Sequence, residues 1–490
     1  MKPVLLLLAS SALWAQPEDA AAKAERARGL VVAGKVEEAI PLYRELTQAY
    51  PNDTAILVNL SIAEFKARLY HDAAGHAASA VKLQPDSLAA NLFLGSSYVE
   101  LGEYSLAIAP LNKVVAAQPQ DRNARLMFGE ALLNLERHEE AETQFQKARA
   151  LAPENPKVWY GLGRTFEALS ESVFRQLENA NPDSPYWHAL VADLFLRQRR
   201  YGSAFQHYRM ALERHATLRG MHAGLATVYK RTGYAAWAEI EEQRERQAAP
   251  DCTAGGLACD FAAGRFHEII QSTRSATTAE GQYWACKAYG EMAQESFSRL
   301  GQLPTSLEKH LHAAKTFDAQ GLSREAAGEW REALKIVPGD VRIETALAWS
   351  LFRSHEFRAA QTVLTDLLKQ DHDSRELNFL YGASLANLDE PEKAITPLEG
   401  AIRLDENFLP AQAALGQALL QTAQPSQAIP HLKAALAADE DASTHFRLLR
   451  AYQLTGQHEL AAQAKMEYQK ALRNAETKAR LEEGGAITAP

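Results

Sequence analysis

Prolines recur at a spacing of 34 residues through the first third of the chain: Pro51, Pro85, Pro119 and Pro153. Each follows an amphipathic segment and precedes, within a few residues, a polar residue of the kind that begins helices: Asp53, Asp86, Asp121 and Asn155. A proline cannot continue a helix, so it commonly follows a helix end. The spacing therefore predicts a repeat in which one helix pair ends before each proline and the next pair begins after it.

Small residues keep the same register. Alanine recurs in the second half of each unit: Ala39, Ala73, Ala107 and Ala141. The first half of each unit has its own small residue: Ala27, Ser61, Gly95 and Gly129. Gly34 and Gly102 fall between the halves, where a tight turn needs a positive φ. The pattern predicts two helices per unit that approach closely through small side chains.

These features resemble the tetratricopeptide repeat, a helix-turn-helix of 34 residues with the signature W-x2-L-G-x2-Y, A-x3-F and P. Parts of the signature occur as Gly95-x2-Tyr98 with Ala107, as Gly129 with Ala141-x3-Phe145 and Pro153, and as Trp159-x2-Leu162-Gly163-x2-Phe166. The resemblance implies an all-α fold, an α-solenoid whose helix pairs stack into a right-handed superhelix. It also implies a non-enzymatic scaffold that binds a protein or peptide.

The register predicts five sections along the chain. A signal peptide at residues 1–15 precedes an array of four repeats at 20–155. Residues 156–306 form an irregular helical segment with two embedded repeats, because Arg175 and Pro182 break the pattern of the second helix. A second array of five repeats spans 307–475, and residues 476–490 are expected to form a flexible tail.

The irregular pattern occurs twice. One set of residues recurs at an offset of 123: Tyr160, Phe166, Phe174 and Leu177 match Tyr283, Tyr289, Phe297 and Leu300. A second set recurs at an offset of 122: Ala204, Tyr208 and Ala211 match Ala326, Trp330 and Ala333. We interpret this as an internal duplication of an irregular helical unit followed by a regular repeat; the alternative is that two amphipathic stretches align by chance.

The first fifteen residues, MKPVLLLLASSALWA, combine Lys2, an apolar core and small residues, as export signals do. The alternative is a buried N-terminal helix, since Leu13 stands where a signal peptidase prefers a small residue. No later stretch has 18 apolar residues in a row, so we expect no transmembrane segment in the mature chain. The interpretation is a protein exported to the periplasm or secreted.

The chain has three cysteines, and two of them lie close together in sequence. In an oxidising compartment Cys252 and Cys259 can bridge across the turn at Gly255 and Gly256; the alternative is two unpaired thiols. Their spacing differs from the CxxC pairs of structural zinc sites, so we expect no metal.

Composition and motifs argue against several functions. The net charge is −9 and no basic stripe follows the repeat, so we expect no nucleic-acid partner. The chain lacks a GxSxG elbow, a GxxxxGK phosphate loop and a GxGxxG loop, and its His-Glu pairs lack a second histidine at zinc-binding spacing. We therefore predict no enzymatic activity and no cofactor.

The resemblance implies that the first helix of each repeat lines a groove. In the second array, aromatic and cationic residues hold its exposed places: Lys315, Arg342, Trp349, Phe352, Arg353 and Phe379. Trp and Arg are typical of residues that dominate binding energy, so these are the candidate partner-binding residues. In the first array the same places are apolar, among them Val58 and Leu92, for which packing in the core is the preferred interpretation.

Two alternatives to groove binding remain. Any of these side chains can instead pack against the next repeat as core. The chain can also be a structural subunit of an envelope machine that assembles, secretes or handles polysaccharide, binding through its convex face or its ends.

Because each helix pair buries its apolar stripe only against its neighbours, the first array should be stable as a stack. Burying one Leu or Phe side chain contributes about 1.5–3 kcal/mol. We expect a fragment cut at residue 155 to give a helical circular dichroism spectrum with a thermal transition. A random-coil spectrum would contradict the solenoid interpretation.

Overall fold

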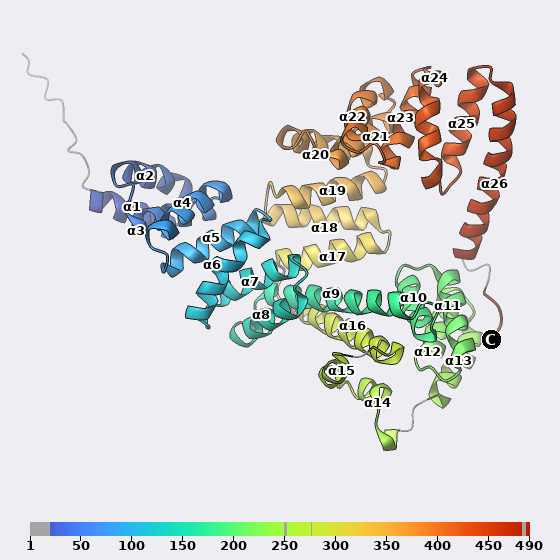
Figure 1. Ribbon diagram of the computed structural model, residues 1–490, viewed down its shortest axis with the longest axis horizontal. Coiled ribbons are helices and arrows are strands. Elements are labelled where there is room, and N and C mark those ends of the chain that lie inside the picture. Colours follow the sequence, from blue (N-terminus) through green and yellow to red (C-terminus); the bar gives the residue numbers. More distant parts are fainter. Residues whose placement is uncertain (1–19, 249–251, 276, 483–486) are drawn as a thin grey trace, which may run out of the picture. The chain divides into compact units, whose positions relative to one another are not determined.

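The computed structural model describes residues 20–248, 252–275, 277–482 and 487–490, and the expected signal peptide lies outside them. Across these ranges the regular structure consists of 26 α-helices and two short 3-10 helices (Figure 1). Most helices form consecutive helix-turn-helix pairs, which confirms the predicted all-α solenoid. The chain divides into two compact units, with the boundary after Ala168 inside α9 (Pro156–Ala180).

The first unit contains four helix pairs and the start of α9. The pairs are α1 (Ala20–Val32) with α2 (Val36–Ala49), α3 (Thr54–Lys66) with α4 (Tyr70–Leu83), α5 (Leu88–Glu100) with α6 (Tyr104–Ala117), and α7 (Arg122–Asn134) with α8 (His138–Leu151). The second helix of each pair packs against the first helix of the next, so the pairs stack in chain order.

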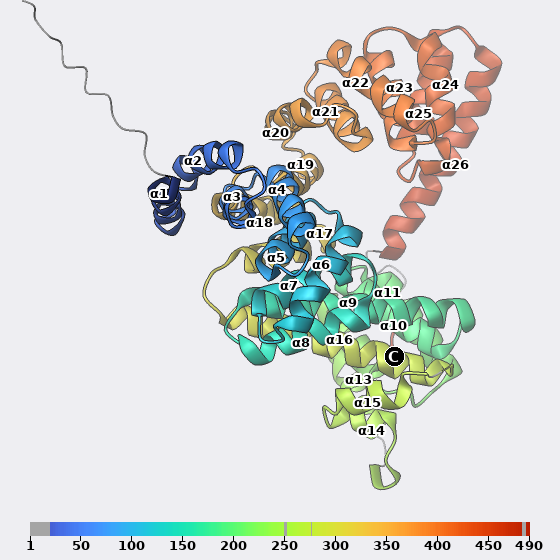
Figure 2. The same ribbon diagram turned by 60° about the vertical axis from the view of Figure 1, so that its left-hand side comes forward.

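The second unit begins with the rest of α9 and an irregular part. Its helices are α10 (Pro185–Arg197), α11 (Tyr201–Arg214), α12 (Met221–Arg231), α13 (Ala235–Gln247), the 3-10 helix η1 (Cys252–Ala254), α14 (Leu257–Ala262), α15 (Phe266–Thr273) and α16 (Ala279–Gln302). Figure 2 shows α14 and α15 as two short helices beside α16, which differ from the longer pairs of the arrays.

Five further pairs complete the second unit. They are α17 (Leu307–Ala319) with α18 (Ser323–Ile336), α19 (Val341–Arg353) with α20 (Phe357–Gln370), α21 (Arg375–Asn387) with α22 (Pro391–Leu404), α23 (Leu409–Gln421) with α24 (Pro425–Ala435) and the 3-10 helix η2 (Leu436–Ala438), and α25 (Ser443–Leu454) with α26 (His458–Glu482). No helix in the described ranges is long and apolar enough to cross a membrane.

Side-chain caps begin the first helices at the predicted spacing. The Asp53 carboxylate accepts from the amides of Ala55 and Ile56, and Asp121 does the same 68 residues later for Asn123 and Ala124. Such caps satisfy amides that have no partner within the helix. One predicted residue is corrected: Ser87 caps α5, while Asp86 pairs with Lys113 at 2.7 Å.

The carbonyl groups of three periodic prolines accept hydrogen bonds from the fourth residue of the following helix. Asn91 donates to the Pro85 oxygen at 3.0 Å, Arg125 to that of Pro119 at 2.7 Å and Trp159 to that of Pro153 at 2.6 Å. In the second array Asn378 and Gln412 donate to the carbonyl six residues earlier in the same way. Each bond joins the connection between two repeats to the helix that follows it.

The same helix position also joins the two helices of a pair. In four pairs its side chain bonds a residue 19 positions later on the second helix, and in α12 the second residue, His222, does the same: Arg125 with Gln144, His188 with His207, His222 with Glu241, His310 with Glu329, and Gln412 with His431. The distances lie between 2.5 and 3.0 Å. A polar link within each of these pairs therefore accompanies the apolar contact.

The two helices of each pair cross where side chains are small. The alanines of the second helices are fully buried: Ala39, Ala73, Ala107, Ala141, Ala204, Ala238, Ala326, Ala360, Ala394 and Ala428. On the first helices, a Cβ added at Gly95 would lie 2.5 Å from Leu111, and one added at Gly416 would lie 2.5 Å from Leu432. Contacts that short do not occur, so these glycines set the distance between the helices.

At the first break in the register, one long helix replaces the two helices and the turn of a regular repeat. α9 runs for 25 residues through the place where Arg175 was expected to belong to a second helix, and α16 runs for 24 residues in the corresponding place. A shift of 122 residues carries the bounds of α10 and α11 onto those of α17 and α18. Two long helices of nearly the same length, each followed at nearly the same offset by a regular pair, favour the duplication over chance alignment.

A charged cluster joins α10, α11 and α16 in this irregular part. The Asp193 carboxylate accepts from the Tyr208 hydroxyl at 2.7 Å and from the Lys287 ammonium at 2.8 Å. Burial alone would lower the pKa of Lys287, but the Asp193 charge outweighs it and raises this pKa. Burial and the same carboxylate raise the pKa of Tyr208, so its hydroxyl remains a donor.

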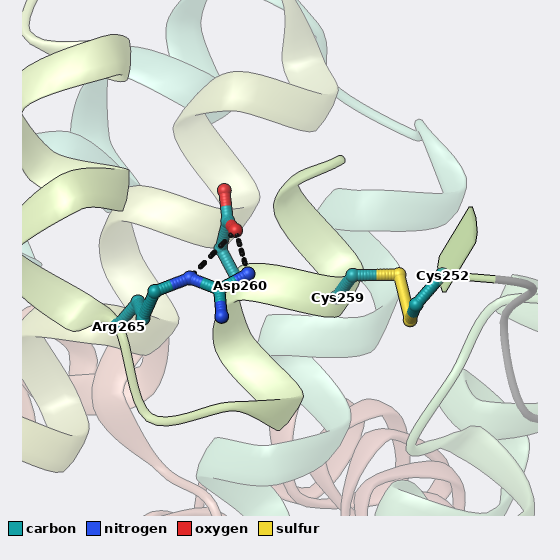
Figure 3. Close-up of a disulfide and its surroundings, with 4 residues drawn as sticks. All are labelled: Cys252, Cys259, Asp260 and Arg265. Atoms are coloured by element: carbon teal, nitrogen blue, oxygen red, sulfur yellow. Dashed lines mark hydrogen bonds and ion pairs between the residues drawn. A yellow bond between two sulfur atoms is a disulfide. The ribbon is translucent and has the colours of Figure 1, made fainter. Parts of the chain in front are cut away.

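The second break contains a disulfide between Cys252 and Cys259 (Figure 3). It is the pairing considered from sequence, with Cα atoms 5.6 Å apart, and it joins η1 to α14 across Gly255 and Gly256. Figure 3 also shows Arg265 next to Asp260. The Nε of Arg265 donates to the Asp260 carboxylate at 3.0 Å.

Gly416 and Gly328 provide a matched test of the helix crossing. A methyl group at Gly416 would overlap buried Leu432, whereas one at Gly328 in α18 has nothing within 4 Å. We expect Gly416→Ala to destabilise the second unit by about 1–3 kcal/mol through overpacking. Gly328→Ala should be neutral or stabilise by up to about 1 kcal/mol through helix propensity. Thermal unfolding of both variants measures the difference, and equal midpoints would contradict the crossing as the constraint.

Candidate partner-binding site

Aromatic side chains from three successive first helices meet in the second array. Trp349 and Phe352 of α19 face Phe379 of α21, with ring centroids 6.2 and 5.9 Å apart, and Phe379 lies 5.2 Å from Phe408 just before α23. Phe357 contacts Phe352 at 5.6 Å. We call these five residues the aromatic cluster.

Two arginines lie over rings of the aromatic cluster. The Arg353 guanidinium is 5.3 Å from the centroid of Trp349, and that of Arg375 is 4.6 Å from the centroid of Phe408. Arg375 also donates to Asp405 at 2.5 Å and pairs with Glu376. A cation over an aromatic face is attracted to it by the charge distribution of the ring.

Burial separates core members of the aromatic cluster from surface members. Phe379 is only 7% exposed and packs with the residues between α19 and α23, so it belongs to the core. Trp349 and Phe352 are partly buried, and Arg353 is exposed. The accessible part of the site therefore consists of the outer sides of Trp349 and Phe352 with the Arg353 guanidinium above.

The remaining two predicted residues have other surroundings. Arg342 is exposed and donates to Asp340, the N-cap residue of α19, at 3.2 Å. Lys315 is exposed on α17, where burial and the Lys315 charge lower the pKa of His312. His312 itself stacks on Phe297 with centroids 3.8 Å apart.

Sequence reasoning missed three members of this surface. Phe357 begins α20, Arg375 begins α21 and Phe408 is the N-cap residue of α23, so none occupies an exposed place in the middle of a first helix. The sequence signal that marks them is an aromatic or Arg beside a helix start, next to a repeat whose first helix is already aromatic.

The apolar strip of the first array is largely core. Val58, Val99, Leu126 and Leu133 are buried, and Leu92 is partly buried. Phe65 contacts Phe93 and Tyr70 through ring edges at 5.5 and 5.4 Å. These side chains join neighbouring helices, so they give no comparable surface.

Models of two families match parts of the chain. The tetratricopeptide repeat model matches residues 126–171, 168–218 and 345–407, and that of the anaphase-promoting complex, cyclosome, subunit 3 matches residues 66–148. No curated protein matches. The matched segments coincide with helix pairs of both units, so the chain is a tetratricopeptide repeat protein. Proteins of this class are in general interaction scaffolds that bind proteins or peptides.

Solved structures of repeat proteins align with parts of the chain. MamA 41-end from Desulfovibrio magneticus RS-1 is 29% identical over 30% of this chain and 82% of its own, with a TM-score of 0.28. MamA MSR-1 is 20% identical over 47% and 95%, with a TM-score of 0.27. YrrB, titled a TPR protein with an unusual peptide-binding site, is 19% identical over 41% and 88%, with a TM-score of 0.28.

Burial predicts different stability effects at two predicted site residues. Phe379→Ala should lower the free energy of unfolding by about 3–5 kcal/mol, because it leaves a cavity among buried side chains. Arg353→Ala removes an exposed cation from a ring and should cost no more than about 1 kcal/mol. Urea unfolding followed by circular dichroism compares the two, and similar losses would show that Arg353 is part of the core.

Proposed function

We propose that the second array binds a segment of a partner protein on the surface formed by Trp349, Phe352 and Arg353, extended toward Phe408 and Arg375. The observation that supports this most directly is the pair of arginines placed over aromatic rings on successive repeats, at 5.3 and 4.6 Å. Trp and Arg are the residues most often responsible for binding energy in interfaces.

The geometry suggests how such a segment is held. The outer sides of Trp349 and Phe352 offer apolar area to one or two apolar side chains of the partner. The Arg353 guanidinium lies over Trp349 and is exposed, so its N–H groups can donate to a carboxylate or a carbonyl oxygen. Because the contact with Trp349 already restricts the guanidinium, binding orders it at a lower entropic cost. The partner segment is therefore one that combines apolar and acidic residues.

We infer further that the protein works outside the cytoplasm. The disulfide between Cys252 and Cys259 supports this, because disulfides persist in oxidising compartments and are rare in the cytosol.

A pull-down from native extract tests the proposed surface. The bait carrying Trp349→Ala and Arg353→Ala should recover its specific partner at least about tenfold less well than the wild-type bait, since two hot-spot side chains are removed. The matched control is Trp159→Ala with Arg149→Ala in the first unit. It also removes an arginine that lies over a tryptophan ring, with the Arg149 guanidinium 5.9 Å from the Trp159 centroid. Circular dichroism should show both baits folded. Unchanged recovery of the partner with the Trp349→Ala, Arg353→Ala bait would contradict the proposed surface.

A further inference from the structure

The pair α12 and α13 lacks the cover that the other repeats receive. In the arrays each second helix packs against the first helix of the next pair, as α20 does against α21 and α22 against α23. Among the helices of the described chain, α12 is the one with which α13 has extensive contacts. As a result Tyr234 and Ile240 are 42% and 43% exposed, and Trp237 is only partly buried.

A non-helical segment of the same chain contacts this pair. Ile487 is partly buried and packs against the hydrophobic cluster that contains Phe205 and Tyr229, as Trp237 does. The hydroxyl of Tyr229 donates to the carbonyl oxygen of Thr488 at 2.7 Å. Figures 1 and 2 show the end of the chain beside these helices. Residues 487–490 thus occupy a definite place, although this tail was expected to be flexible from residue 476.

The receiving surface is built from interlocked rings. Tyr229 contacts Phe205 at 5.9 Å and Trp237 at 5.6 Å, and Tyr234 stacks on Trp237 at 4.4 Å. The Tyr229 ring is fully buried, and burial raises the pKa of its hydroxyl, which therefore stays protonated and can donate. The rings hold this donor in place independently of the segment that it contacts.

The contacts define what the surface recognises. It takes one β-branched aliphatic side chain, from Ile487, and one main-chain carbonyl, from Thr488. Thr488 and Ala489 are exposed, so they are not selected by the surface. A ligand needs an uncharged aliphatic residue followed by a residue whose main-chain carbonyl is free to accept.

We propose that the exposed surface of α12 and α13 is a peptide-binding site. Ile487–Pro490 occupies this site as an intramolecular ligand, and a partner segment of the same chemistry displaces it. One side chain and one hydrogen bond give weak binding, so occupancy of the site depends on the covalent link between the segment and the rest of the chain. This link supplies an effective concentration on the order of millimolar. A partner with further contacts can compete with it. This site is separate from the surface around Trp349 and does not rest on it.

Fluorescence anisotropy with a labelled peptide of residues 484–490, Gly-Gly-Ala-Ile-Thr-Ala-Pro, tests the proposal. In the full chain, Ile487→Asp places a charge against the apolar cluster and empties the site. This variant should bind the peptide at least about tenfold more tightly than the wild type, whose site is occupied at millimolar effective concentration. Adding Tyr229→Phe should weaken binding by about fivefold through loss of one hydrogen bond.

Controls separate this site from the other one and from misfolding. Ile487→Val should behave as the wild type, and a peptide with Asp in place of Ile should not bind. A chain ending at residue 482 is a second emptied form if Ile487→Asp lowers the thermal midpoint. Trp349→Ala with Arg353→Ala should leave peptide binding unchanged. Absence of saturable binding by both emptied forms up to about 10 mM, or equal affinity for emptied and wild-type chains, would overturn the proposal.

Discussion

The close approach of the two helices within each pair is the constraint on which the rest of the structure depends. At Gly95 and Gly416 no Cβ fits, because Leu111 and Leu432 occupy the space that it would need. The corresponding alanine of ten second helices is fully buried, as at Ala107 and Ala428. Small residues at these two places let the larger apolar side chains interlock, and they can recur only once per repeat. Their recurrence therefore has the 34-residue period of the helix pairs.

Polar contacts then fix how each pair connects to the next. The fourth residue of a first helix bonds back to the carbonyl six residues earlier, as Arg125 does to Pro119, or across to the second helix, as Arg125 does to Gln144. Buried polar groups need such partners because desolvating them without a hydrogen bond costs free energy. The side chains differ from repeat to repeat, so the position is maintained while the residue type is not.

The two binding surfaces proposed for this protein lie where the regular stack leaves side chains accessible. One is the aromatic cluster, where Phe379 is core and its neighbours Trp349 and Arg353 remain accessible. The other is the pair α12 and α13, where Thr488 accepts a hydrogen bond from Tyr229 and Ile487 packs against the neighbouring hydrophobic cluster. Both follow from the stacking of repeats. A repeat whose surface is completely packed against its neighbours has no side chains left for a partner. A repeat without a full neighbour exposes the face that the neighbour would have buried.

The sequence by itself determined the fold class, the helix pairs and their register, because these depend on small residues, prolines and caps that recur at a fixed spacing along the chain. It also showed where the register breaks, since Arg175 and Pro182 violate the period. Tertiary structure alone decided that Phe379 is core, that Phe408 and Arg375 join the aromatic cluster, that Lys287 pairs with Asp193, and that Thr488 meets Tyr229. Such contacts join residues far apart in the chain at no fixed spacing, so they leave no periodic signal, and they depend on which helices meet in space.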